Sequence, residues 1–157
     1  MTSTTPENKS TVLEASLPSE NTSRPTILVV DDSPANLTIL SDVLKDQYRV
    51  RVANSGARAL AAVKIAPRPD LILLDIMMPE MDGYAVMRAL RADAETADIP
   101  VIFVTAMDTD TDEEFGLLLG AVDYVTKPIR PAILMARINT HISLSHVRRM
   151  QALGPLV

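Results

Sequence analysis

Short apolar runs alternate with longer amphipathic stretches along most of the chain, beginning near residue 26. The runs are rich in β-branched residues and are bounded by polar residues, a pattern typical of strands that are buried in a parallel sheet. We therefore expect five strands, at residues 26–31, 48–53, 70–75, 99–105 and 121–126.

The stretches between the runs predict helices, because their apolar residues recur at helical spacing and their ends carry capping residues. Ser33 and Pro34 predict the start of the first helix, with serine as the N-cap and proline in the first helical position. Pro67 ends the second helix, and Gly120 fits the C-terminal cap of the fourth. We expect helices that begin at Pro34, span residues 55–66, 82–92 and 111–119, and run on at length from Pro131.

This alternation of strand and helix predicts the α/β class, with a parallel sheet that is covered on both faces and joined by right-handed crossovers. Five such units without a glycine-rich phosphate loop favour a flavodoxin-like, doubly wound five-stranded sheet in the order 2-1-3-4-5, with an extended C-terminal helix. We divide the chain into a disordered polar tail at residues 1–24, a folded domain at 25–143, and an extension of the last helix at 144–157.

Composition narrows the class of function. The chain has 157 residues, a net charge of −5 and 47% hydrophobic residues, which suit one folded domain without a basic surface for nucleic acid. It has no cysteine and no apolar stretch of about 20 residues, so we expect a cytoplasmic protein with no membrane partner.

Acidic residues follow two of the predicted strands. Asp31 and Asp32 follow the first strand, and Asp75 ends the third, its neighbour in the predicted order. Carboxyl ends of parallel strands share one edge, where ligands bind, so the three carboxylates are expected to lie close together. Two carboxylates about 4 Å apart repel by roughly 4 kcal/mol at an effective dielectric constant near 20. A hard divalent cation removes this repulsion, and Mg²⁺ suits oxygen ligands of this kind.

Two further residues complete a candidate phosphoryl site at the same edge. Thr105 ends the fourth strand and can donate a hydrogen bond to an anionic oxygen, and Lys127 follows the fifth with a compact positive charge. The Lys127–Pro128 bond can be cis. Since Asp31 and Asp32 are adjacent and share the metal, Asp75 is the expected nucleophile, forming an acyl phosphate.

The chain resembles the receiver domain of two-component response regulators over about residues 24–149. The segments that carry the resemblance are ILVVDD at 27–32, DIMMPEMDG at 75–83, VTA at 104–106 and GAVDYVTKP at 120–128. The resemblance implies that Asp75 accepts a phosphoryl group from the phosphohistidine of a sensor histidine kinase or a phosphotransfer protein. It implies Mg²⁺ bound by Asp32, Asp75 and the backbone carbonyl of Met77, with Asp31 helping through water.

The resemblance also implies a switch. Thr105 and Lys127 would contact the phosphoryl group, and the ring of Tyr124 would turn inward as the Thr105 hydroxyl moves toward the phosphate. The responding surface would consist of the helix at 111–119, the strand at 121–126 and the final helix. Met77 and Met107 occupy positions that modulate dephosphorylation in the family, and because both are apolar here we expect slow to moderate loss of the phosphoryl group.

The final helix and the output leave several interpretations open. The apolar pattern of the final helix continues past the domain at Leu144, Val147 and Met150. These residues would either form a seam that contacts a twin helix or an output domain, or belong to a frayed helical tail. We expect the chain to form a homodimer on activation and to have an output domain or effector protein as its partner. The chain would be either a single-domain regulator or an excised receiver. The last helix is similar in character to linkers that lead into cyclic-di-GMP-handling domains. The chain would not be an enzyme but a phosphoacceptor that promotes its own phosphotransfer and dephosphorylation.

Two alternatives come from other classes. An aspartyl-nucleophile phosphatase typically carries a second acid two residues after the nucleophile, where this chain has Met77. A receiver-like interaction domain that works without phosphorylation typically loses one of the five site residues, and this chain keeps Asp31, Asp32, Asp75, Thr105 and Lys127.

Overall fold

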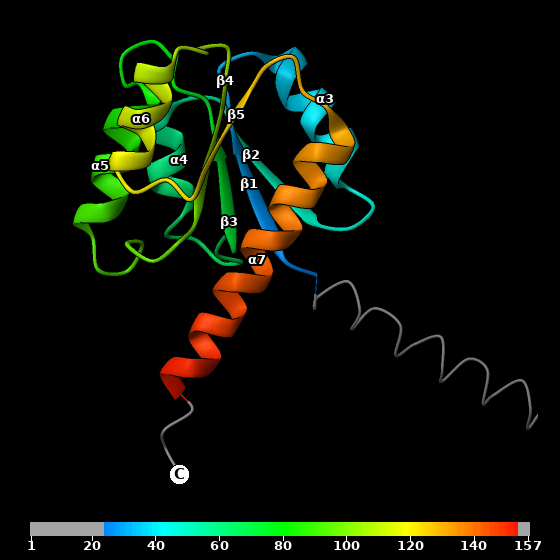
Figure 1. Cartoon of the computed structure of the whole chain (residues 1–157), viewed down its shortest axis with the longest axis vertical. Coiled ribbons are helices and arrows are strands. Elements are labelled where there is room, and N and C mark those ends of the chain that lie inside the picture. Colours follow the sequence, from blue (N-terminus) through cyan, green and yellow to red (C-terminus); the bar gives the residue numbers. More distant parts are fainter. Residues whose placement is uncertain (1–23, 154–157) are drawn as a thin grey trace, which may run out of the picture.

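The computed structural model describes residues 24–153 (Figure 1). The predicted tail at residues 1–24 therefore lies almost wholly outside the described residues. The elements follow one another in strict alternation: β1 Thr26–Val30, α3 Pro34–Leu44, β2 Arg49–Ala53, α4 Gly56–Ala62, β3 Leu71–Leu74, α5 Gly83–Ala92, β4 Val101–Thr105, α6 Asp110–Leu118, β5 Asp123–Thr126 and α7 Pro131–Leu153.

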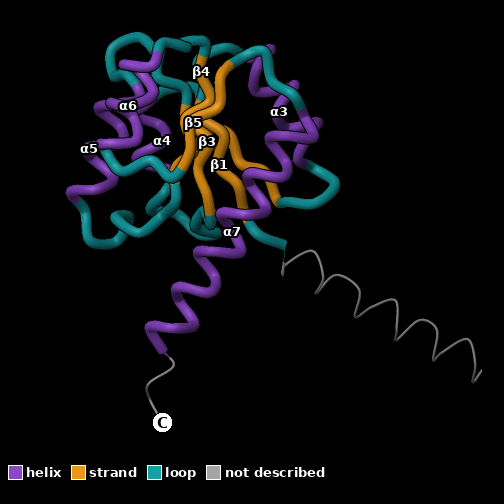
Figure 2. Tube along the Cα trace, viewed as in Figure 1, coloured by secondary structure: helices purple, strands orange, loops and turns teal. Residues whose placement is uncertain are grey.

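The five strands form one parallel sheet in the order β2-β1-β3-β4-β5, which confirms the predicted flavodoxin-like topology. Figure 2 shows the strands in the middle of the domain with helices on both sides. The three central strands β1, β3 and β4 are buried along their whole length, as their continuous apolar sequences require.

Alternate residues of each strand point to opposite faces of the sheet, and each face has its own core. Leu28 and Val30 face the side covered by α4 and α5, whereas Ile27 and Val29 face α3 and α7. Apolar stripes of α3 and α7 pack on the second face, with Leu40, Leu44, Leu134 and Ile138 fully buried and Leu37, Val43 and Ile142 partly buried.

The predicted helix starts are confirmed by their caps. The side chain of Ser33 accepts a hydrogen bond from the amide of Asn36, and Asp82 caps α5 in the same way. Gly120 has φ +109°, a conformation that favours glycine, directly after the cap residue of α6.

The second helix was predicted to reach residue 66, and this is wrong, because α4 ends at Ala62. Beyond it the amides of Lys64 and Ile65 bond to carbonyls three residues back, in the tighter pattern that closes a helix. The carbonyl of Val63 then accepts a hydrogen bond from Arg68 Nε rather than from a helical amide.

Two strands, β4 and β5, begin two residues later than predicted. The amide of Ile99 donates to the carbonyl of Thr96, so Ile99 closes a turn, and β4 starts only at Val101, after Pro100. Similarly, Ala121 donates to the carbonyl of Gly116 and belongs to the end of α6, so β5 starts at Asp123. Local hydrogen bonding at helix ends decides these boundaries.

The final helix α7 is continuous to Leu153 and runs past the sheet (Figure 1). Leu144, Val147 and Met150 on its extension are exposed. Arg149 lies near Asp70, with its guanidinium nitrogen 3.6 Å from the carboxylate. Within residues 24–153, no helix combines the length and apolar character that crossing a membrane requires. The predicted domain boundary at residue 143 remains a prediction.

Candidate functional site

The parallel register of β1 and β3 places the predicted aspartates side by side. Val30 pairs with Leu74, so Asp31 and Asp75 leave the sheet at the same level, and the amide of Asp75 donates to the carbonyl of Val30. Asp31, Asp32 and Asp75 each offer one carboxylate oxygen, and these three oxygens all lie within 4.8 Å of one another. The predicted cluster at the carboxyl edge is therefore present.

Lys127 reaches this cluster from the loop after β5. Its ammonium nitrogen lies 2.8 Å from Oδ2 of Asp31 and 3.3 Å from Oδ2 of Asp75. Burial lowers the pKa of Lys127, but the hydrogen bond to Asp31 and the charge of Asp75 outweigh it and raise the pKa above its usual value. The Lys127–Pro128 bond is cis. The lysine is thus held as a cation between two carboxylates that would otherwise repel each other.

Asp31 is buried and its carboxylate is held by the start of α3. Oδ1 accepts a hydrogen bond from the amide of Ser33 at 2.9 Å, and Oδ2 accepts one from Nδ2 of Asn36 at 3.2 Å. Sequence reasoning missed Asn36, although its place in the first turn after an aspartate-rich strand end is the signal that would have found it. Asp32 is exposed, so the cluster has one open side.

The loop after Asp75 is fixed by Gly83. The amide of Gly83 donates to the carbonyl of Ile76 at 2.8 Å, and a Cβ atom at Gly83 would lie 2.3 Å from the backbone oxygen of Asp75. Only glycine allows α5 to begin this close to the loop. Met77 donates its amide to Oδ1 of Asp75 at 3.3 Å, and its side chain is exposed.

Thr105 and Tyr124 are joined through the backbone of Met107. Thr105 is fully buried, and its hydroxyl oxygen accepts a weak hydrogen bond from the amide of Met107 at 3.4 Å. The Tyr124 hydroxyl donates to the carbonyl of Met107 at 2.6 Å, and its ring is buried in the core. Burial and the nearby negative charges raise the pKa of Tyr124, which keeps the hydroxyl protonated as a donor. The two predicted switch residues thus share one loop.

An aromatic cluster that sequence reasoning missed connects this loop to α5 and α6. Tyr84 packs edge-on against Phe115 and Phe103, with ring centroids 4.7 and 5.7 Å apart, and Phe103 lies 6.0 Å from Tyr124. Gly116 lets α6 approach, because a Cβ there would come within 3.0–3.2 Å of the rings of Phe103 and Tyr124. Of the nine α6 residues Gly116 alone is fully buried, so α6 rests on the domain mainly through these rings.

The donor set of the acidic cluster suits a hard cation. Mg²⁺ holds oxygen ligands at about 2.0–2.1 Å, so opposite ligands stand about 4 Å apart. The 4.8 Å spread of the three carboxylate oxygens fits two direct ligands and a third that acts through water. The arrangement as a whole combines a nucleophile, anion-binding donors and a cation-binding group at one edge of an α/β sheet.

This fold and this edge define a class, the doubly wound α/β proteins that carry an acidic cluster and a lysine at the carboxyl ends of the strands. Residues 27–139 match the response regulator receiver domain, and the chain belongs to that family. Members of the family are typically phosphorylated and bind Mg²⁺ at acidic residues.

The comparison with individual proteins points the same way. The chain is 46% identical over 123 residues to a probable cyclic di-GMP phosphodiesterase of Vibrio cholerae, covering 78% of this chain and 28% of that protein. It is 42% identical over 133 residues to the response regulator PleD of Caulobacter vibrioides, covering 82% and 29%. The chain thus spans less than a third of the length of these two relatives.

Among solved structures, the chain is similar to the signal receiver domain of a signal transduction histidine kinase from Syntrophus aciditrophicus. The TM-score is 0.69 and the identity 35%, covering 76% of this chain and 90% of that one. Receiver folds therefore account for nearly all of the described residues.

Proposed function

We propose that this chain is a phosphorylation-controlled receiver in which Asp75 takes a phosphoryl group from the phosphohistidine of a sensor histidine kinase or phosphotransfer protein. The observation that carries the proposal is the convergence of Asp31, Asp32 and Asp75 within 4.8 Å, with Lys127 bonded to two of them. Family membership supports it.

In the proposed transfer, a carboxylate oxygen of Asp75 attacks the phosphorus atom. A phosphorus–oxygen bond forms, the phosphorus–nitrogen bond to the histidine breaks, and the ring nitrogen keeps the electron pair. Lys127 would turn from the carboxylates to a phosphoryl oxygen, and the buried hydroxyl of Thr105 would donate to another. The chain would thus act as a phosphoacceptor that promotes its own transfer and dephosphorylation rather than as an enzyme for other substrates.

Mg²⁺ would be held by Asp32, Asp75 and the carbonyl of Met77, with Asp31 acting through water. When bound, the ion supplies positive charge to the phosphoryl oxygens. The oxygens of Asp31 already accept hydrogen bonds from Ser33, Asn36 and Lys127, whereas Asp32 is exposed. This difference supports Asp32 as a direct ligand and Asp31 as one that acts through water.

The signal would leave the site through the loop that joins Thr105 to Tyr124. If the Thr105 hydroxyl turns toward the phosphoryl group, the Met107 amide loses its acceptor and the loop shifts, together with the ring of Tyr124. Since α6 rests mainly on aromatic rings, its position would follow, and the surface of α6, β5 and α7 would change.

This surface would control dimerisation or the binding of an output partner. Leu118 on α6 is 85% exposed, and Leu144 and Val147 on the α7 extension are about half exposed, so apolar contact area is available. The similarity to a probable cyclic di-GMP phosphodiesterase supports a cyclic-di-GMP-related output. The chain would act in the cytoplasm, without contacting membrane or nucleic acid directly.

We further propose slow to moderate dephosphorylation. Met77 is 61% exposed beside Asp75, and Met107 borders Thr105, so neither position offers an acid or amide to orient an attacking water. A phosphoryl half-life of only a few seconds would contradict this.

The proposal is tested with acetyl phosphate or beryllofluoride and Mg²⁺. After acetyl phosphate, intact-mass measurement should show one phosphoryl group on the wild-type chain and none on the Asp75→Ala variant, while Asp42→Ala, which removes an exposed aspartate of α3, should be labelled like wild type. Beryllofluoride serves as the noncovalent mimic of the phosphoryl group. Tyr124 resonances and the oligomeric state should change only in the labelled proteins. Unchanged labelling of Asp75→Ala would exclude the proposed acceptor, and a partner bound equally well with and without label would favour a phosphorylation-independent interaction domain.

A further inference from the structure

A basic cleft lies at the edge of the sheet opposite to the acidic cluster, where the strands begin. It has a volume of about 360 Å³ and is formed by the start of β1, the start of β2, the loop before β3 and the extension of α7. The charged and titratable residues that line it are Arg24, Arg49, Arg68, Asp70, His146 and Arg149.

The residues that line this cleft are mainly basic, although the chain as a whole is acidic. Of the residues that the structure describes, four arginines and one aspartate line it, whereas the whole chain carries a net charge of −5. Both oxygens of that carboxylate are engaged inside the protein. Oδ2 of Asp70 accepts a hydrogen bond from the amide of Thr26 at 2.7 Å, and Oδ1 lies 3.6 Å from Arg149. Among the described residues that line the cleft, basic side chains therefore outnumber acidic ones.

The arginines keep donors for a ligand. A guanidinium group has five N–H donors in a planar fork that matches phosphate and carboxylate oxygens. Arg24 uses NH1 on the carbonyl of Lys45. Arg68 uses Nε and NH2 on the carbonyls of Val63 and Glu95, and its NH2 also lies 3.9 Å from the carboxylate of Glu95. These contacts hold the guanidinium groups in place and leave further N–H groups of Arg24, Arg68 and Arg149 for an anion.

The surroundings favour a compact anion over an extended acidic chain. A second hollow shares Arg68, Asp70 and Arg149 with the cleft, but continues along Glu95 and Asp98. An acidic polypeptide that continued in this direction would meet two carboxylates. Pro25, Pro67 and Ile142 add apolar surface to the cleft, which suits the carbon skeleton of an organic phosphate. The volume lies in the range of about 300–1,000 Å³ that small-molecule sites occupy.

We propose that this cleft binds a small, multiply charged phosphate ester, such as a nucleotide or a sugar phosphate. The ligand would contact residues of the sheet edge and of the α7 extension at once, because Arg24 and Arg68 come from the former and Arg149 from the latter. Binding would therefore fix the α7 extension against the domain. The site is independent of the phosphoryl chemistry at Asp75, which lies at the other edge of the sheet.

The test is a titration of the ¹⁵N-labelled chain, followed by NMR, in low-salt buffer with a chelator so that the acidic cluster attracts no phosphate through a metal. The probes are pyrophosphate, ribose 5-phosphate, adenosine triphosphate and a polyglutamate peptide. We expect the amide resonances of Thr26, Asp70 and Ser145 to shift when the phosphate compounds are added. The relative affinities of ribose 5-phosphate and adenosine triphosphate then show whether the cleft prefers a sugar phosphate or a nucleotide.

Two variants and two controls make the result decisive. Arg149→Gln and Arg24→Gln, each with a well-dispersed native spectrum, should bind the best probe about tenfold more weakly, since each loses a charge-assisted hydrogen bond. Arg58→Gln, an exposed arginine of α4, should bind as wild type does. Asp75→Asn should also bind normally, so failure here and failure of phosphorylation are separate results. Absence of shifts at the cleft, equal weakening by Arg58→Gln, or tighter binding of polyglutamate than of every phosphate would overturn the proposal.

Discussion

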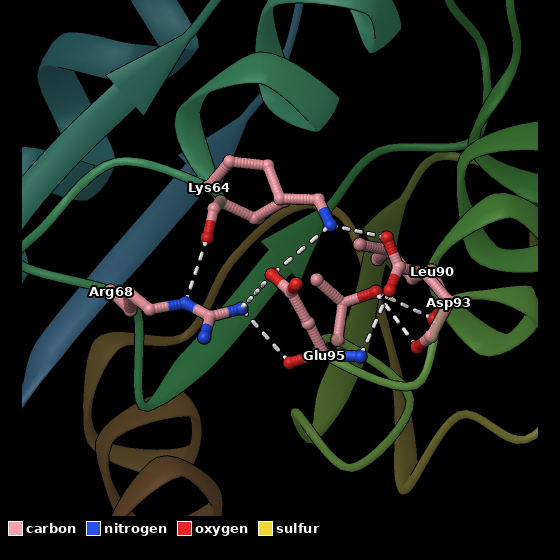
Figure 3. Close-up of polar contacts among 7 residues, drawn as sticks. Lys64, Arg68, Leu90, Asp93 and Glu95 are labelled. Carbon is pink, nitrogen blue, oxygen red and sulfur yellow. Dashed lines mark hydrogen bonds and ion pairs between the residues drawn. The ribbon is translucent and has the colours of Figure 1, made fainter.

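The two edges of the sheet arrange their charges in opposite ways. At the carboxyl edge three aspartates lie together, and one lysine forms buried or nearly buried contacts with two of them. At the amino edge the charges that join α4 to α5 are paired on the surface. Lys64 contacts Asp93 and Glu95, and Arg68 lies 3.9 Å from Glu95 (Figure 3).

The difference separates the acidic site from the surface ion pairs that link α4 to α5. Exposed ion pairs such as those in Figure 3 contribute little to stability, and they satisfy each other without needing a ligand. At the carboxyl edge one ammonium group offsets only part of the negative charge of the three aspartates. A bound cation, or a reaction that neutralises an aspartate, would reduce the repulsion that remains between the carboxylates. Function is expected where charge remains uncompensated.

The largest expected effect comes from breaking the backbone that supports the carboxyl edge. Gly83→Ala should lower the free energy of unfolding by about 3 kcal/mol, because the new Cβ would collide with the backbone at Asp75 and Ile76. Urea unfolding measures this. Gly116→Ala is the matched control, since its Cβ would meet only side-chain rings and alanine favours a helix, and it should change stability by less than about 1 kcal/mol. Equal losses in the two variants would contradict the close approach at Asp75.

The next effect removes the ammonium group that contacts the acidic cluster. Lys127→Met should lower the free energy of unfolding by about 2 kcal/mol without metal, a figure below that of a fully buried pair because the lysine side chain is 18% exposed. Added Mg²⁺ should then stabilise the variant more than the wild type, since three uncompensated carboxylates attract the ion. Thermal unfolding with and without Mg²⁺ checks this, and a variant that responds to Mg²⁺ less than wild type would argue against a metal at the cluster.

A smaller effect appears in the dependence on pH. The pKa of Lys127 is raised in the folded state, so its stabilising contribution is complete below the unfolded pKa near 10.4 and is lost as the pH rises through the folded pKa. The raised pKa values of Tyr48, Tyr84 and Tyr124, caused first by burial, act with the same sign. We therefore expect wild-type stability to fall above about pH 10 and the Lys127→Met variant to fall less steeply. Parallel curves would show that the lysine contacts do not form in solution.

The smallest effect is expected at the amino edge. The hydrogen bond to Asp93 raises the pKa of Lys64, and the same bond lowers the pKa of Asp93, yet both groups face solvent. Lys64→Met should change the free energy of unfolding by no more than about 0.5 kcal/mol, and salt should reduce even this. Urea unfolding at low and high salt measures it. A loss as large as that of Lys127→Met would remove the contrast between the two edges.

Much of the site could be predicted from the sequence because it follows from topology. Alternating strands and helices require a parallel sheet, a parallel sheet gathers the ends of its strands at one edge, and the residues at those ends are Asp31, Asp75 and Thr105. Neighbouring strands in the order 2-1-3-4-5 then bring the aspartates together without further information. The caps at Ser33 and Asp82 are equally local, since each depends on residues within three positions.

Contacts between distant segments had to come from the tertiary structure. The aromatic cluster joins Tyr84, Phe103 and Phe115, which no periodicity connects, and the basic cleft joins Arg24 to Arg149 across nearly the whole domain. The sequence by itself determined which strand ends form the acidic edge, because alternating strands and helices require a parallel sheet whose carboxyl ends share one edge. Only the folded chain decided which side chains pair across it, because such pairing depends on the path of every segment between them.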